Sequence, residues 1–125
     1  MISIQEVAYS DDILVLRSTG ALSTKADLDT YLKAGLAFYQ HHNPLFVILD
    51  ETEVTNNLGL IANFGFADRI IENMLLLDLK KMAIITREAD FENNQEFANF
   101  LNAKEINLRV FLNKGDALIW ITEEA

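Results

Sequence analysis

The chain has 125 residues, of which 50% are hydrophobic and 23% charged, the size and composition of a single globular domain. Its net charge of −9 should repel phosphate backbones and anionic lipids, so we expect neither a nucleic-acid partner nor binding to a membrane surface. The chain has no cysteine for disulfide or thiolate chemistry, no apolar run near the roughly 20 residues of a membrane span, and no signal-peptide pattern. Together these features predict a cytoplasmic protein.

The first predicted element is a β-hairpin. Two short runs carry isoleucine or valine at every second position, Ile2 and Ile4 in the first and Ile13 and Val15 in the second, and the turn-forming residues Ser-Asp-Asp occupy positions 10–12 between them. The first strand should be an antiparallel edge of the sheet. Gly20 is expected to end the second strand.

A helix should follow. Ser23 or Thr24 can cap its amino end, Asp27 suits its first turn, and Pro44 prevents continuation beyond residues 41–43. The apolar residues of this segment recur at spacings of three and four and form one face that should pack on the sheet: Leu28, Leu32, Gly35, Leu36 and Tyr39.

The central strand is predicted from a continuous apolar run. Residues 45–49 are Leu-Phe-Val-Ile-Leu, a pattern typical of a strand buried on both faces. A polar loop is expected over residues 51–57, at the carboxyl end of that strand, where ligands usually sit in an open α/β sheet. The candidate rim loop therefore consists of Asp50, Glu51, Thr52, Glu53, Thr55, Asn56 and Asn57.

Three carboxylates of this loop allow two interpretations. Asp50, Glu51 and Glu53 can hold a divalent metal or act as an acid/base pair, or they can form a solvated acidic rim partly neutralised by Arg87. Their spacing matches no metal loop, so we predict no metal, no cofactor and no catalytic residue.

Other candidates for chemistry have plain structural explanations. Helix capping accounts for Ser23 and Thr24, the two hydroxyl groups near the rim. His41 and His42 precede the central strand, which places them about 20 Å from Asp50 at its far end. We therefore expect helix-terminal histidines and no His–Asp site.

A second helix, predicted within residues 60–77, is more apolar than a half-exposed helix needs to be. Its excess apolar surface is either a homodimer or partner interface or the core of its own domain, and the sequence leaves both open. The candidate interaction surface consists of Leu58, Ile61, Phe66, Ile70 and Leu77.

The remaining elements are a buried strand over 81–86, a helix capped by Asp90 and a last strand over 108–112. Residues 117–122 have the composition of a strand, but Asn113 can cap a helix with Asp116 at its third position, so a helix is favoured. Strands alternating with helices predict one α/β domain over residues 1–125. Its sheet should be five-stranded, mixed and mostly parallel, with an N-terminal antiparallel hairpin and about four helices.

Three stretches carry a family resemblance: residues 20–23 (Gly-Ala-Leu-Ser) with Asp27, the strand ending at Asp50, and residues 109–111 followed by the segment 116–121. On these residues the chain resembles the STAS domain superfamily, in particular its small stand-alone SpoIIAA-like proteins. The resemblance implies a βα fold of this connectivity and a role in protein binding and regulation.

Some members of that superfamily are switched by phosphorylation at a hydroxyl residue before the second helix. The corresponding stretch here resembles residues 55–59, Thr-Asn-Asn-Leu-Gly, which places asparagine at the acceptor position. Thr52 and Thr55 lie nearby but do not match by position. We therefore expect no phosphorylation switch.

These observations lead to a non-enzymatic regulatory or protein-interaction module that works as a homodimer or with another protein. The alternative is a binder of a small apolar or amphipathic ligand between the sheet and the second helix, with some of the eight phenylalanines as lining. A third hypothesis is a metal-dependent hydrolase that uses Asp50 and Glu51.

Overall fold

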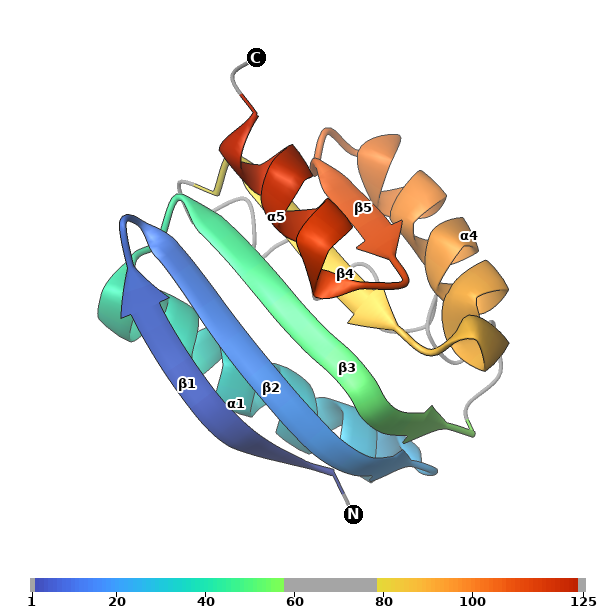
Figure 1. Cartoon of the computed structure of the whole chain (residues 1–125). Helices are drawn as coiled ribbons and strands as arrows, with labels where there is room; N and C mark the ends of the chain where they lie inside the picture. The colour runs from blue at the N-terminus through green and yellow to red at the C-terminus, as the bar shows by residue number, and fades with distance from the viewer. Residues whose placement is uncertain (1, 58–78, 124–125) are drawn as a thin grey trace.

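A computed structural model describes residues 2–57 and 79–123 of the chain. Its five strands form one sheet in the order β1-β2-β3-β4-β5, in which β1 is antiparallel to β2 and the other neighbours are parallel (Figure 1). This confirms the predicted mixed sheet with an antiparallel edge. The strands are β1 (Ser3–Ser10), β2 (Ile13–Leu22), β3 (Phe46–Asn56), β4 (Lys81–Thr86) and β5 (Leu108–Phe111).

The hairpin forms as predicted, but its second strand is longer. Asp11 and Asp12 both have positive φ, 51° and 65°, the conformation of a type I′ turn, which matches the twist of the paired strands. Gly20 does not end β2. It adopts a φ of 110° within the strand, which suits glycine, and pairing with β3 carries the strand on to Leu22.

Helix α1 (Lys25–His42) has the predicted ends. The Thr24 hydroxyl accepts a hydrogen bond from the Asp27 backbone N–H, and the Asp27 carboxylate accepts from the Thr24 N–H, forming a capping box. At the carboxyl end, Asn43 takes a left-handed conformation and donates its N–H to the Tyr39 carbonyl at 2.7 Å.

The central strand β3 is buried on both faces over its first half, as predicted, and Val47 and Ile48 have no exposed surface. The predicted loop over residues 51–57 is wrong, because β3 continues to Asn56. The extension pairs with the end of β2, and it buries Val54 against Leu22 and Leu28. Tertiary pairing thus overrides the polar character of this segment.

Helices lie on both sides of the sheet. α1 and α4 (Phe91–Asn102) cover one face, and α5 (Lys114–Thr122) lies on the other, over β3, β4 and β5 (Figure 1). The first face packs a large core that includes Leu14, Val47, Ile84, Leu101 and Leu108. The second face packs Ile48, Ala83 and Ile85 against Ala117, Trp120 and Ile121 of α5.

The predicted cap of α4 is wrong. A 3₁₀ turn, η1 (Glu88–Asp90), precedes the helix, and the Asp90 carboxylate accepts hydrogen bonds from the Arg87 guanidinium in place of a helix N–H. Arg87 therefore neutralises Asp90, on its own side of the sheet, and has no hydrogen bond to the acidic end of β3 among the contacts described.

The tail is a helix, as favoured. The Asn113 side chain accepts from the Asp116 N–H at 2.8 Å, and the Lys81 ammonium donates to the carbonyls of Trp120 and Glu123 at the other end of α5. The described residues therefore contain three α-helices and one 3₁₀ turn, fewer than the predicted four or so. The predicted second helix, and with it the whole candidate interaction surface (Leu58, Ile61, Phe66, Ile70 and Leu77), lies outside the described residues.

Candidate functional site

The carboxyl ends of β2 and β3 meet at one edge of the sheet. Leu22 pairs with Asn56, and the Asn57 N–H donates to the Leu22 carbonyl at 2.8 Å, so both strands end at the same level. Beyond them the Asn57 side-chain amide donates to the Ser23 hydroxyl at 3.1 Å. We call Ser23, Thr24, Asp27 and Asn57 the β2–β3 rim.

The rim is polar but internally paired. The Asp27 carboxylate accepts from the N–H groups of Ser23 and Thr24 at 3.0 and 3.1 Å. These backbone hydrogen bonds, Ser23 foremost, lower the pKa of Asp27 and keep it ionised at the start of α1. The Thr24 hydroxyl thus caps α1, as predicted, whereas the Ser23 hydroxyl, for which capping was also predicted, accepts from Asn57 instead.

Two β-bulges flank the middle of β2. One residue of β2 separates Arg17 from Thr19, but two residues of β3 separate their partners Asp50 and Glu53. In β1 the register shifts at the same level, between Ile4 and Glu6. An extra residue re-aims the side chains that follow it, so both bulges change which side chains meet around Arg17.

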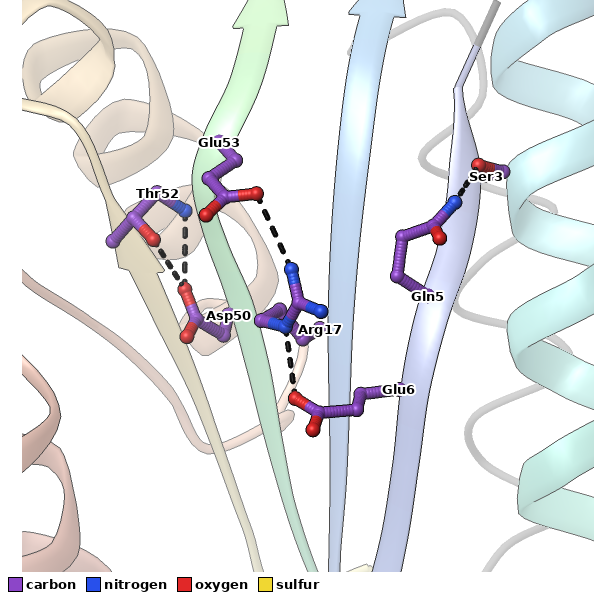
Figure 2. A network of polar contacts seen from close by, with 7 residues as sticks. All are labelled: Ser3, Gln5, Glu6, Arg17, Asp50, Thr52 and Glu53. Carbon is purple, nitrogen blue, oxygen red and sulfur yellow. Dashed lines mark hydrogen bonds and ion pairs between the residues drawn. The ribbon is translucent and has the colours of Figure 1, made fainter.

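Figure 2 shows the resulting Arg17 cluster on the sheet face opposite α1. The guanidinium donates to Glu6 at 2.8 Å and to Glu53 at 3.2 Å, and Thr52 donates twice to Asp50 beside them. Glu6 and Glu53 are well exposed, so these ion pairs contribute little to stability. They do neutralise part of the acidic charge that the sequence places here.

The three predicted carboxylates do not form one site. Asp50 and Glu53 lie near Arg17 on the open face, while Glu51 points to the opposite face and accepts a hydrogen bond from Tyr31 of α1 at 2.6 Å. Within the described ranges no group of three or more His, Asp or Glu side chains is placed to hold a metal ion. An acid/base or metal site built from Asp50 and Glu51 together is therefore incompatible with the geometry.

Burial, helped by the nearby Asp90 and Asp50 charges and opposed by the Tyr31 hydrogen bond, raises the pKa of Glu51 to about 7. Tyr31 also accepts from the Ser18 hydroxyl at 3.3 Å, and Ser18 is fully buried. We call Ser18, Tyr31 and Glu51 the Glu51 chain.

The remaining rim-loop residues are dispersed along β3. Thr52 is exposed at the bulge, Thr55 pairs with Ala21, and Asn56 pairs with Leu22. Only Asn57 follows the end of the strand, so it alone of the seven predicted residues belongs to the β2–β3 rim.

No family model matches the sequence, and no curated protein matches it either. Solved structures do match over nearly the whole length. An anti-sigma factor antagonist from Mycobacterium paratuberculosis superposes with a TM-score of 0.67 at 12% identity, covering 98% of this chain and 96% of that one. An uncharacterized DUF3478-family protein with a SpoIIAA-like fold, from Shewanella loihica PV-4, superposes with a TM-score of 0.53 at 23% identity, covering 96% and 93%.

The chain has a SpoIIAA-like, or STAS-like, fold. At these identities the likeness shows the fold alone, and it confirms the fold that the sequence motifs implied. In the SpoIIAA-like fold of this chain, the motif residues Gly20–Ser23 and Asp27 are those that bring β2 to the rim and start α1.

Sequence reasoning missed the Glu51 chain, although two signals for it were present. Ser18 continues the parity of Leu14 and Leu16, so a polar side chain stands at a buried position. Tyr31 follows Leu28 by three residues, which places it on the same face of α1. Both signals mark a hydroxyl group that points into the core and needs a partner.

Within the part of the chain that is described, no helix is long and apolar enough to cross a membrane. The cytoplasmic location stays a prediction.

Proposed function

We propose that this chain is a non-enzymatic regulatory module that acts by binding another protein through the β2–β3 rim. The observation that carries the proposal is the full-length likeness to a solved anti-sigma factor antagonist, a protein whose name describes regulation by opposing another protein. The proposal extends that general role to this chain and leaves the identity of its partner open.

The chemistry of the rim supports this choice of surface. Ser23, Thr24 and Asn57 are exposed, and their short side chains can donate and accept hydrogen bonds at a sheet edge. The capping box and the hydrogen bond between Asn57 and Ser23 fix the positions of these groups before any partner arrives. A preorganised surface loses less side-chain entropy on binding.

We further propose that the rim works without phosphorylation. Asn56 and Asn57 follow Thr55 where phosphorylated members of the superfamily carry hydroxyl residues, and an asparagine side chain has no hydroxyl group to receive a phosphoryl group. Binding at the rim would therefore be controlled by how much partner is available. A homodimer through residues 58–77 would use a surface outside the described residues, so the rim is the surface that can be tested with defined contacts.

The test compares partner recovery by a tagged protein and by its double variant Ser23→Lys, Asn57→Lys, purified from cells of its source under identical conditions. Two long cations at the rim should remove the neutral hydrogen-bonding surface and reduce recovery of the partner at least about tenfold, since the loss of a hot-spot residue at the centre of an interface costs about 2 kcal/mol or more. Quantitative mass spectrometry measures the recovery.

The matched control is Ala37→Lys, Gln40→Lys, which adds the same two charges at exposed positions far along α1 from its capped end. The control should recover as much partner as the unmodified protein. Equal recovery by the rim variant, or equal loss by both variants, would refute the rim as the binding surface. Circular dichroism of both variants checks that they remain folded.

A further inference from the structure

The Glu51 chain places a titratable carboxyl group inside a sheet–helix interface. Glu51 lies in β3 opposite Thr86 of β4, on the face that α1 covers, and its carboxylate is 2.6 Å from the Tyr31 hydroxyl. Tyr31 in turn is 3.3 Å from the Ser18 hydroxyl of β2. Three neighbouring elements, β2, β3 and α1, therefore meet through one line of hydrogen bonds.

This line of hydrogen bonds is compatible with both protonation states of the Glu51 carboxyl group. With Glu51 ionised, Ser18 donates to Tyr31 and Tyr31 donates to the carboxylate. With Glu51 protonated, both hydrogen bonds can reverse, because a hydroxyl group both donates and accepts. A proton can thus bind to Glu51 while the Ser18 and Tyr31 hydroxyl groups both stay hydrogen-bonded. This matters because a buried polar group without a hydrogen-bond partner is costly.

The described surroundings favour the protonated state. The titratable groups that act on Glu51 are Tyr31 and Tyr39 from α1 and Asp90 from η1, together with Asp50, its neighbour in the strand on the other face. Both aspartates oppose a second negative charge, while the Arg87 guanidinium is hydrogen-bonded to Asp90. The neutral side chains nearby are Ser18 of β2 and Thr86 of β4.

We propose that Glu51 is the proton-binding group of a pH-sensitive device: it holds a proton in the folded protein below neutral pH, releases it in mildly alkaline solution, and thereby weakens the packing of α1 on the sheet. This inference concerns regulation of the fold and does not rest on the proposed partner. Its physical basis is that an ionised carboxylate at this interface is more stable when it is hydrated. Water can reach it only if α1 and Tyr31 move away from β3.

The direction of the effect follows from linkage. The pKa of Glu51 is about 7 in the folded protein and has its ordinary value near 4.5 in the unfolded chain. The stabilisation from the bound proton is therefore fully present below about pH 4.5 and is lost as the pH rises through about 7. Between pH 6 and 8 the folding equilibrium constant should fall about tenfold from this group alone.

The first test is a ¹³C NMR titration of glutamate side chains in the full chain. The Cδ resonance of Glu51, assigned through its backbone amide, should titrate with a midpoint about pH 7. In Tyr31→Phe the midpoint should move upward, because the Tyr31 hydrogen bond favours the ionised form. A midpoint below about 5, near the ordinary glutamate value, would overturn the proposal.

The second test measures hydrogen-exchange protection factors of α1 amides at pH 6 and pH 8. They should fall about tenfold in the unmodified protein and stay level in Glu51→Gln, a neutral side chain that still accepts from Tyr31. The control is His41→Gln, His42→Gln, which removes both histidines of the chain and should keep the fall. An equal fall in Glu51→Gln and the unmodified protein would overturn the proposal.

Discussion

Trp120→Ala is expected to reduce the free energy of unfolding by about 3–5 kcal/mol, because the indole joins α5 to the sheet. Trp120 is 8% exposed and packs in the cluster formed by Ile48, Ala83 and Ile85. Its ring also lies 5.7 Å from that of Phe111. Alanine at this position would leave a cavity that the sheet cannot close. Trp120 is the only tryptophan in the chain, so the variant has no tryptophan fluorescence to follow. Urea unfolding is therefore monitored by circular dichroism.

Two cations add to the role of Trp120. The Lys81 ammonium lies 5.2 Å and the Arg109 guanidinium 5.6 Å from the ring centre, within range of a cation–π contact. Ile119→Ala is the matched control, because this neighbour on the same helix is 69% exposed and should cost less than about 0.5 kcal/mol. Similar small losses in both variants would mean that α5 is not packed on the sheet.

Truncating a buried side chain of the central strand β3 should be nearly as destabilising as Trp120→Ala, on either face of the sheet. Ile48→Ala is expected to cost about 2–5 kcal/mol by opening the α5 side, and Val47→Ala roughly 2 kcal/mol by opening the α1 side. Both side chains have no exposed surface. The two losses should appear as lower midpoints in urea with unchanged cooperativity.

Val7→Ala supplies the control for Val47→Ala with the same chemical change. Val7 lies on the edge strand β1 and is 39% exposed, so its truncation should cost less than about 0.5 kcal/mol. If Val47→Ala were as mild as Val7→Ala, the α1 face of β3 would not be the core that the structure describes.

Most features with a local cause were predictable from the sequence, although the predicted Asp90 cap was wrong. The two aspartates of the hairpin turn, the Thr24–Asp27 capping box and the Asn113 cap each act over a few residues, and each forms as expected. The apolar run of residues 45–49 predicted the central strand for the same reason. The family resemblance then implied a fold with the same connectivity as the predicted elements.

Features that depend on pairing between distant segments were not predictable. β2 passes Gly20 and β3 passes Glu51 because each strand supplies the other with hydrogen bonds, and neither sequence alone shows this. Glu51 reaches the α1 face because it continues the alternation of Val47 and Leu49, and the bulge after it turns Glu53 to the same face as Asp50. A cluster of three acids along the sequence therefore became two separate sites in space.

The same reasoning explains why the rim was found only in part. Ser23, Thr24 and Asp27 were identified as cap residues, and Asn57 as part of a loop, but their proximity depends on where β2 and β3 end. The hydrogen bond between Asn57 and Ser23 joins residues 34 positions apart. Only the register of the two strands brings them together.

The most direct test of the central proposal is photo-crosslinking in cells from a benzophenone side chain placed at Asn57. The account predicts a covalent adduct with one other protein from position 57 and none from the exposed position of Gln40. No adduct from position 57, or the same adducts from both positions, would contradict a protein-binding rim.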